Sequence, residues 1–171
     1  MMDASQDLLE LVAAARENAK TFEDRISEVS KLMGGQNGSD AQVAELRDAT
    51  VALELATVDI FSTFEARMQH HFRRGPFSRK LKSLLLEAGQ TDLADRLHQY
   101  YLAVNVLKHG KGASYRELLN APSSLFTVKS TEGITADETP PSAGLVDVSE
   151  SGFFEGLTTT IVEAYHFLEK K

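Results

Sequence analysis

The fold is decided by one stretch near the N-terminus, residues 8–64, which reads LLELVAAARENAKTFEDRISEVSKLMGGQNGSDAQVAELRDATVALELATVDIFSTF. In its first half, apolar residues alternate at intervals of four and three: Leu8, Val12, Ala15, Ala19, Phe22, Ile26, Val29 and Met33. This spacing keeps them along one narrow seam of a helix, as in coiled coils and antiparallel hairpins. The pattern predicts a helix from Ser5 to Met33.

The two halves of this stretch are separated by Gly34-Gly35-Gln36-Asn37-Gly38-Ser39. Glycine and asparagine readily adopt the left-handed conformations that end helices. A second helix is expected over residues 41–73, with Asp40 as its cap. Because residues 51–64 are apolar almost all round, this helix is the central, buried one. Together the two helices form an antiparallel hairpin over residues 5–73.

The rest of the chain supplies shorter elements. Helical patterns cover residues 77–88, 92–109 and 114–119, and a last helix is expected within 151–171. Residues 123–150 form an arm with two β-prone runs, 125–128 and 145–148. We expect an all-α fold: a single domain over residues 1–171, built as an up-and-down bundle of four to five helices. A small β-hairpin or irregular arm is expected near residues 125–148.

Composition limits the classes of function. The chain has 171 residues, of which 25% are charged, and a net charge of −7. It has no cysteine, which excludes disulfides, a thiolate nucleophile and a cysteine zinc site. The longest apolar runs are interrupted by Glu54, Asp59 and Glu65, and no secretory signal is recognisable. We therefore expect a cytoplasmic protein without membrane, metal or cofactor.

Charge is unevenly distributed. Residues 67–117 hold ten Lys/Arg and four Asp/Glu, a local net charge of +6 in an acidic chain. Such a segment attracts a phosphate-bearing partner. A solvated face that pairs with the acidic helices is the simpler explanation, and we favour it.

The most distinctive string, residues 100–112, reads YYLAVNVLKHGKG. Asn105 and His109 are four residues apart and share a helical face, with His98, Tyr101 and Lys108 near it. Histidine transfers protons near neutral pH, and lysine neutralises phosphate charge. These residue types in this pattern indicate a site that binds or cleaves a phosphodiester.

The same string has a purely structural explanation. Basic side chains in the last turn of a helix interact favourably with its dipole, by roughly 0.3–1 kcal/mol each. Glycine is the usual residue just past a helix end, which accounts for Gly110. An ordinary helix C-terminus therefore explains Lys108, His109 and Gly110 without a ligand.

At these residues the chain resembles the HEPN (higher eukaryotes and prokaryotes nucleotide-binding) superfamily. Its domains are all-α bundles of four or five helices, and many carry an arginine, a polar residue and a histidine in one motif. Asn105 and His109 match the polar residue and the histidine, while Val104 stands where the arginine is expected. Lys108 and Arg96 are the candidates to replace it. By architecture the resemblance covers about residues 41–118.

The resemblance implies a nucleotide- or RNA-binding or interaction module with weak or no catalysis. In such a module Asn105, Lys108 and His109 would form a phosphate-contacting patch, and its neighbours would include Arg73, Arg74, Lys111 and Arg116. An alternative is a metal-independent endoribonuclease of a toxin or defence system. In it His109 acts as general acid or base, Asn105 positions the phosphate and Lys108 stabilises charge. A third possibility is a purely structural homodimer, and a homodimer is expected in each case.

Overall fold

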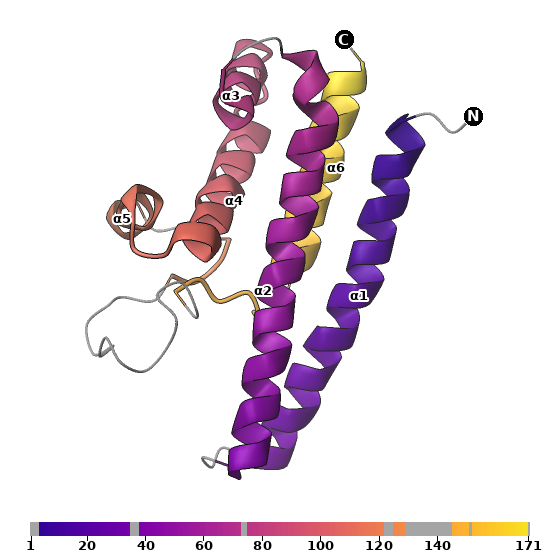
Figure 1. Ribbon diagram of the computed structural model, residues 1–171. Coiled ribbons are helices and arrows are strands. Elements are labelled where there is room, and N and C mark those ends of the chain that lie inside the picture. The colour runs from indigo at the N-terminus through magenta and orange to yellow at the C-terminus, as the bar shows by residue number, and fades with distance from the viewer. Residues whose placement is uncertain are drawn as a thin grey trace.

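The computed structural model describes residues 4–34, 38–72, 75–121, 125–128, 145–150 and 152–170 (Figure 1). The all-α prediction is confirmed. The described residues form six α-helices and one turn of 3₁₀-helix: α1 (Ala4–Met33), α2 (Asp40–Met68), η1 (Gln69–His71), α3 (Phe77–Glu87), α4 (Thr91–His109), α5 (Ala113–Asn120) and α6 (Phe153–Glu169). Each lies within a few residues of a segment predicted from the sequence.

Helices α1 and α2 form the expected antiparallel hairpin (Figure 1). The predicted cap at Asp40 is wrong, because Ser39 caps α2 and Asp40 is its first helical residue. The hydroxyl of Ser39 accepts a hydrogen bond from the backbone N–H of Gln42 at 3.1 Å. The Gln42 side chain accepts one from the Ser39 N–H at 3.0 Å. This reciprocal capping box satisfies two backbone donors that would otherwise lack partners.

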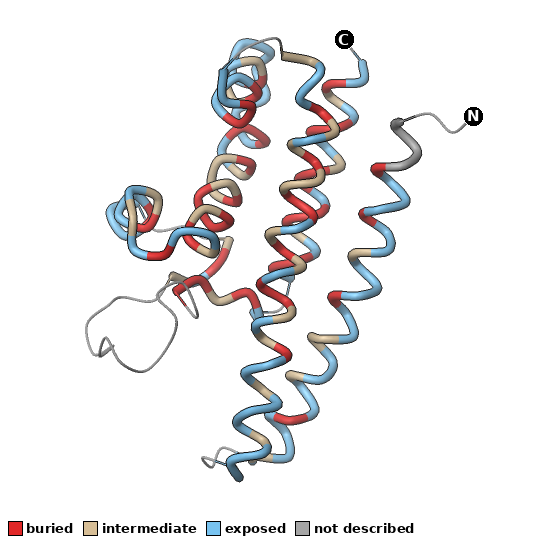
Figure 2. The backbone as a smooth tube through the Cα atoms, in the orientation of Figure 1, coloured by how far each residue is buried: buried red, intermediate tan, exposed pale blue. Residues whose placement is uncertain are grey.

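The core lies where α2, α4 and α6 face one another. Figure 2 shows buried residues gathered along these three helices, whereas the end of the α1–α2 hairpin near its loop is mostly exposed. Phe61 and Phe64 of α2 are completely buried, and Phe64 stacks edge-on against Phe77 of α3 with ring centroids 5.3 Å apart. Burying one such side chain contributes about 1.5–3 kcal/mol. Helix α2 therefore buries one face in this core, but the prediction that residues 51–64 are buried almost all round is wrong at Val51 and Leu55, which are 38% and 60% exposed.

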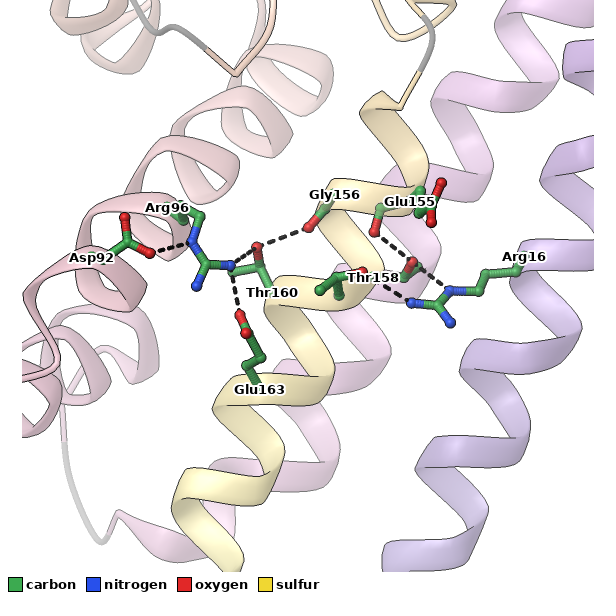
Figure 3. A network of polar contacts seen from close by, with 9 residues as sticks. Arg16, Asp92, Arg96, Glu155, Gly156, Thr158, Thr160 and Glu163 are labelled. Carbon is green, nitrogen blue, oxygen red and sulfur yellow. Dashed lines mark hydrogen bonds and ion pairs between the residues drawn. The ribbon is translucent and has the colours of Figure 1, made fainter.

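Two arginines hold neighbouring helices against α6 (Figure 3). Arg96 of α4 contacts Asp92 at 2.9 Å on its own helix, and on α6 it contacts Thr160 at 3.1 Å and Glu163 at 2.6 Å. Arg16 of α1 donates to Thr158 of α6 at 2.7 Å. Helix α6 is therefore held from both sides by polar contacts as well as by its apolar face.

Much of the arm, residues 129–144, lies outside the described residues. Its two described ends meet in one antiparallel bridge between Val128 and Val146, and the Asp147 N–H donates to the Thr127 carbonyl at 3.0 Å. No strand extends this bridge within the described part of the chain. The prediction was a small β-hairpin or an irregular arm. In the described residues the two ends of the arm are joined at one bridged pair, and a hairpin is not seen there.

Candidate functional site

The predicted site lies at the C-terminus of α4, and the helix ends at His109 as expected. Gly110 caps α4 with φ 73° and ψ −137°, and its N–H donates to the Val106 carbonyl at 2.8 Å. Residues other than glycine rarely adopt that backbone conformation, because their Cβ atom clashes with the backbone. The predicted role of Gly110 as the helix stop is confirmed.

A tight turn joins α4 to α5. The Gly112 N–H donates to the Gly110 carbonyl at 2.8 Å, which places the exposed Lys111 at the tip of a three-residue turn. Asn105 lies half-buried on α4, and its Nδ2 donates to the hydroxyl of Ser114 on α5 at 3.3 Å. Asn105 therefore fixes α5 relative to α4.

Ser114 also lines a cleft of about 420 Å³ between α3, α4 and α5. Three basic side chains border it: Arg79 and Lys82 from α3, and His98 from α4. Glu117 of α5 is the one acidic residue among those that line it. With the histidine neutral, the lining keeps a net positive charge, which suits an anionic ligand.

Glu117 is engaged by His98. Nε2 of His98 lies 2.7 Å from the Glu117 carboxylate, and the imidazole packs near the Tyr101 ring with centroids 6.2 Å apart. A carboxylate bound to one imidazole nitrogen orients the ring and fixes its tautomer. Arg79 and Lys82 also line the cleft, and the single negative charge of Glu117 balances only one of their two positive charges.

A second polar cluster lies beside the cleft. The Ser78 hydroxyl donates to the Glu65 carboxylate at 3.4 Å. Burial raises the pKa of Glu65, while the nearby charge of Lys108 and the Ser78 hydrogen bond act to lower it. Lys108, itself exposed, is therefore close enough to act on a carboxylate of α2.

The structure separates the residues that the sequence grouped together. Asn105 reaches the edge of the cleft through Ser114, whereas Lys108 and His109 are exposed and are not among its lining residues. Lys111 and Arg116 are exposed on the turn and on α5, and Arg73 and Arg74 lie outside the described residues. Figure 3 shows Arg96 directed at α6, where it contacts Glu163 and Thr160.

Sequence reasoning missed Arg79, Lys82 and Glu117 as site residues. In the sequence all three residues belong to the basic segment 67–117, which has no motif that marks them as a site. The turn at Gly89, whose φ is 79°, folds α3 back along α4 and brings the basic side chains to His98. Helical spacing reports neighbours on one helix, not neighbours across such a turn.

Comparison with protein families, curated proteins and solved structures finds no match for this chain. Within the described ranges, no three His, Asp or Glu side chains come close enough together to hold a metal ion. No helix in this part of the chain combines the length and apolar character that crossing a membrane requires. Function is therefore inferred from the cleft itself.

Proposed function

We propose that the protein is a HEPN-like helical module that binds a nucleotide or RNA through phosphate at the cleft between α3, α4 and α5. The observation that carries this proposal is the convergence of Arg79, Lys82 and His98 on one cleft with a single, already paired carboxylate. The lack of cysteine supports a cytoplasmic location, which belongs to the same proposal.

The cleft suits a ligand of nucleotide size. Its volume of about 420 Å³ lies within the roughly 300–1,000 Å³ of small-molecule pockets. Arg79 offers a planar fork of donors to phosphate oxygens, and Lys82 adds a point charge. The Tyr101 ring, which lines the same cleft, provides a surface on which a base can stack.

Exposed basic residues extend this positive surface beyond the cleft. Lys111 stands on the turn between α4 and α5, and Arg116 is exposed on α5. A single strand whose nucleotide occupies the cleft meets further phosphate contacts there. RNA is therefore expected to bind more tightly than a mononucleotide, and more weakly as salt rises.

The test is a titration of labelled single-stranded RNA and of AMP at low salt. The Lys82→Ala and Arg79→Ala variants should each weaken binding about tenfold, as the loss of one charge-assisted contact implies. Arg47→Ala, which removes an exposed charge from α2, is the control and should bind like the wild type. Absence of binding by the wild type, or equal losses in all three variants, would refute the proposal.

One observation favours the metal-independent endoribonuclease as a second candidate. The hydrogen bond between His98 and Glu117 orients an imidazole at the cleft, the arrangement used for general acid–base catalysis. Incubation of labelled RNA with chelator, for the wild type, His98→Ala and His109→Ala, decides the question. Cleavage that survives chelation and is lost in one histidine variant supports it; equal products from all three exclude it.

A further inference from the structure

A second hollow, of about 620 Å³, lies between the end of η1, helix α3 and the last turn of α6, and is called here the α3–α6 hollow. Figure 1 shows the start of α3 and the end of α6 at the same end of the bundle. The walls of this hollow include Phe72, Leu84 and Leu168. Pro76 and Arg79 line both this hollow and the cleft of the proposed function. The two spaces therefore adjoin at the start of α3.

Arg79 stands on the ridge between the two spaces. Successive residues of an α-helix are turned by about 100° around its axis. Lys82, which lines the cleft, is therefore turned from Arg79 by about 60° in one direction, and Lys80, which lines the α3–α6 hollow, by about 100° in the other. Arg79 lies between these two faces of α3 and is exposed. A group bound over Arg79 can thus extend into both spaces.

Positive charge is concentrated on this ridge. Over residues 77–86, helix α3 carries no acid and three basic side chains: Arg79, Lys80 and Lys82. The side chain of Lys80 is directed toward the start of the helix, since a Cβ atom built at Gly75 would lie 2.9 Å from its Cε. Cations grouped in this way attract a phosphate to the start of α3.

The acids that line the two spaces lie away from the ridge. Glu87 is the last residue of α3, about 12 Å along the helix from Arg79. Glu117 lines the cleft from α5 and is engaged by His98. Two further carboxylates nearby contact neighbouring side chains, at 3.8 and 3.4 Å: Glu169 with His71, and Glu65 with Ser78. With the histidines neutral, the joint lining has three positive and two negative charges, so the position of the charges, more than their sum, favours a phosphate over Arg79.

Each of the two spaces also has a half-buried aromatic ring on its wall. Tyr101 of the cleft packs near Phe61, with ring centroids 6.4 Å apart. Phe72 of the α3–α6 hollow packs edge-on against Phe77, with ring centroids 5.5 Å apart. Bases of single-stranded RNA stack on such rings, and neighbouring bases are then splayed apart. A base can therefore stack on either side of the ridge.

We propose that the unit of RNA bound here is a dinucleotide whose bases lie on opposite sides of α3. One nucleotide occupies the cleft, the next occupies the α3–α6 hollow, and the phosphodiester that joins them lies over Arg79. This inference rests on the proposed function, which supplies the first nucleotide, and adds the second subsite. A longer strand then crosses the start of α3, with its other end toward the turn that carries Lys111.

Titration of the full chain with AMP and with the 5′-phosphorylated adenylyl dinucleotide pApA tests the second subsite. The wild type should bind pApA at least about tenfold more tightly than AMP, because pApA adds a stacked base and a phosphate contact. Lys80→Ala should weaken pApA binding about tenfold and leave AMP binding unchanged, since Lys80 lines only the α3–α6 hollow. Lys82→Ala, in the cleft alone, should weaken both ligands equally. Lys20→Ala, at an exposed position on α1, is the control and should bind both like the wild type.

The outcomes separate this inference from the proposed function. If neither ligand binds, the proposed function fails and the second subsite fails with it. If AMP binds and pApA binds no more tightly, only the second subsite is wrong. It is also wrong if Lys80→Ala affects both ligands alike or neither, or if Lys111→Ala weakens pApA binding and Lys80→Ala does not.

Discussion

Replacement of Gly156 by alanine is expected to force α4 and α6 apart. A methyl group built at Gly156 overlaps the hydroxyl of Tyr100, so the two helices approach closely only because the glycine has no side chain. Tyr100 is 3% exposed, and its ring is packed against Phe126 and Phe153 with both centroid distances at 5.8 Å. Packing against these two rings therefore limits how far the tyrosine can turn.

Two opposing effects set the size of the change. Overpacking of a core costs about 1–3 kcal/mol, whereas alanine is favoured over glycine within a helix by about 1 kcal/mol. The expected result is a net loss of up to about 2 kcal/mol, or up to about 8 °C in Tm for a chain of this length. The Tyr100→Phe variant removes this clash. The nearest remaining atom is Cζ of the ring, which lies 3.5 Å from the Cβ position of residue 156, an ordinary contact distance.

The assay is urea and thermal unfolding of four proteins: wild type, each single variant and the double variant. Gly156→Ala should destabilise the wild type and stabilise the Tyr100→Phe background by up to about 1 kcal/mol. If Gly156→Ala changed stability equally in both backgrounds, contact with the tyrosine hydroxyl would not be what requires glycine.

Two further changes test the polar contacts. Glu65→Gln should raise Tm at pH 7 and have no effect at pH 4, because burial raises the pKa of Glu65 and the penalty on its charged form disappears once the carboxyl is protonated. The control is Glu87→Gln, at an exposed position. An equal gain in Tm at both pH values would exclude burial of the charge as the cause. Arg96→Leu should lower stability by about 1–2 kcal/mol, since it removes the contacts to Thr160 and Glu163; unchanged urea unfolding would show that these contacts contribute nothing.

The helices were predictable because hydrophobic periodicity and glycine determine them locally. Helix α1 ends at Met33 as its seam predicts, and Gly110 ends α4. The capping residue of α2 was misassigned, since Ser39 and Asp40 are both good caps and only the reach of Gln42 decides between them. The bridge between Val128 and Val146 joins residues that are far apart in the sequence. The spacing of apolar residues along one helix gives no information on such a pairing.

The candidate site was predictable only in part. Asn105 and His98 were placed near one face of α4, and both border the interface with α5. The contribution of Arg79 and Lys82 follows from the path of the chain through Gly89 and not from any local motif. The His98–Glu117 contact joins residues 19 positions apart on different helices, beyond the reach of helical periodicity.

Chemical-shift mapping with single-stranded RNA tests the central claim most directly, since backbone amides report where a ligand lies on the chain. The proposed cleft predicts shift changes concentrated at its lining segments: residues 76–82, 98–102 and 113–117. Amides of the α1–α2 hairpin near Lys20 and Arg47 should stay unchanged. Changes confined to that hairpin, or none at saturating RNA, would contradict the assignment of the cleft as the binding site.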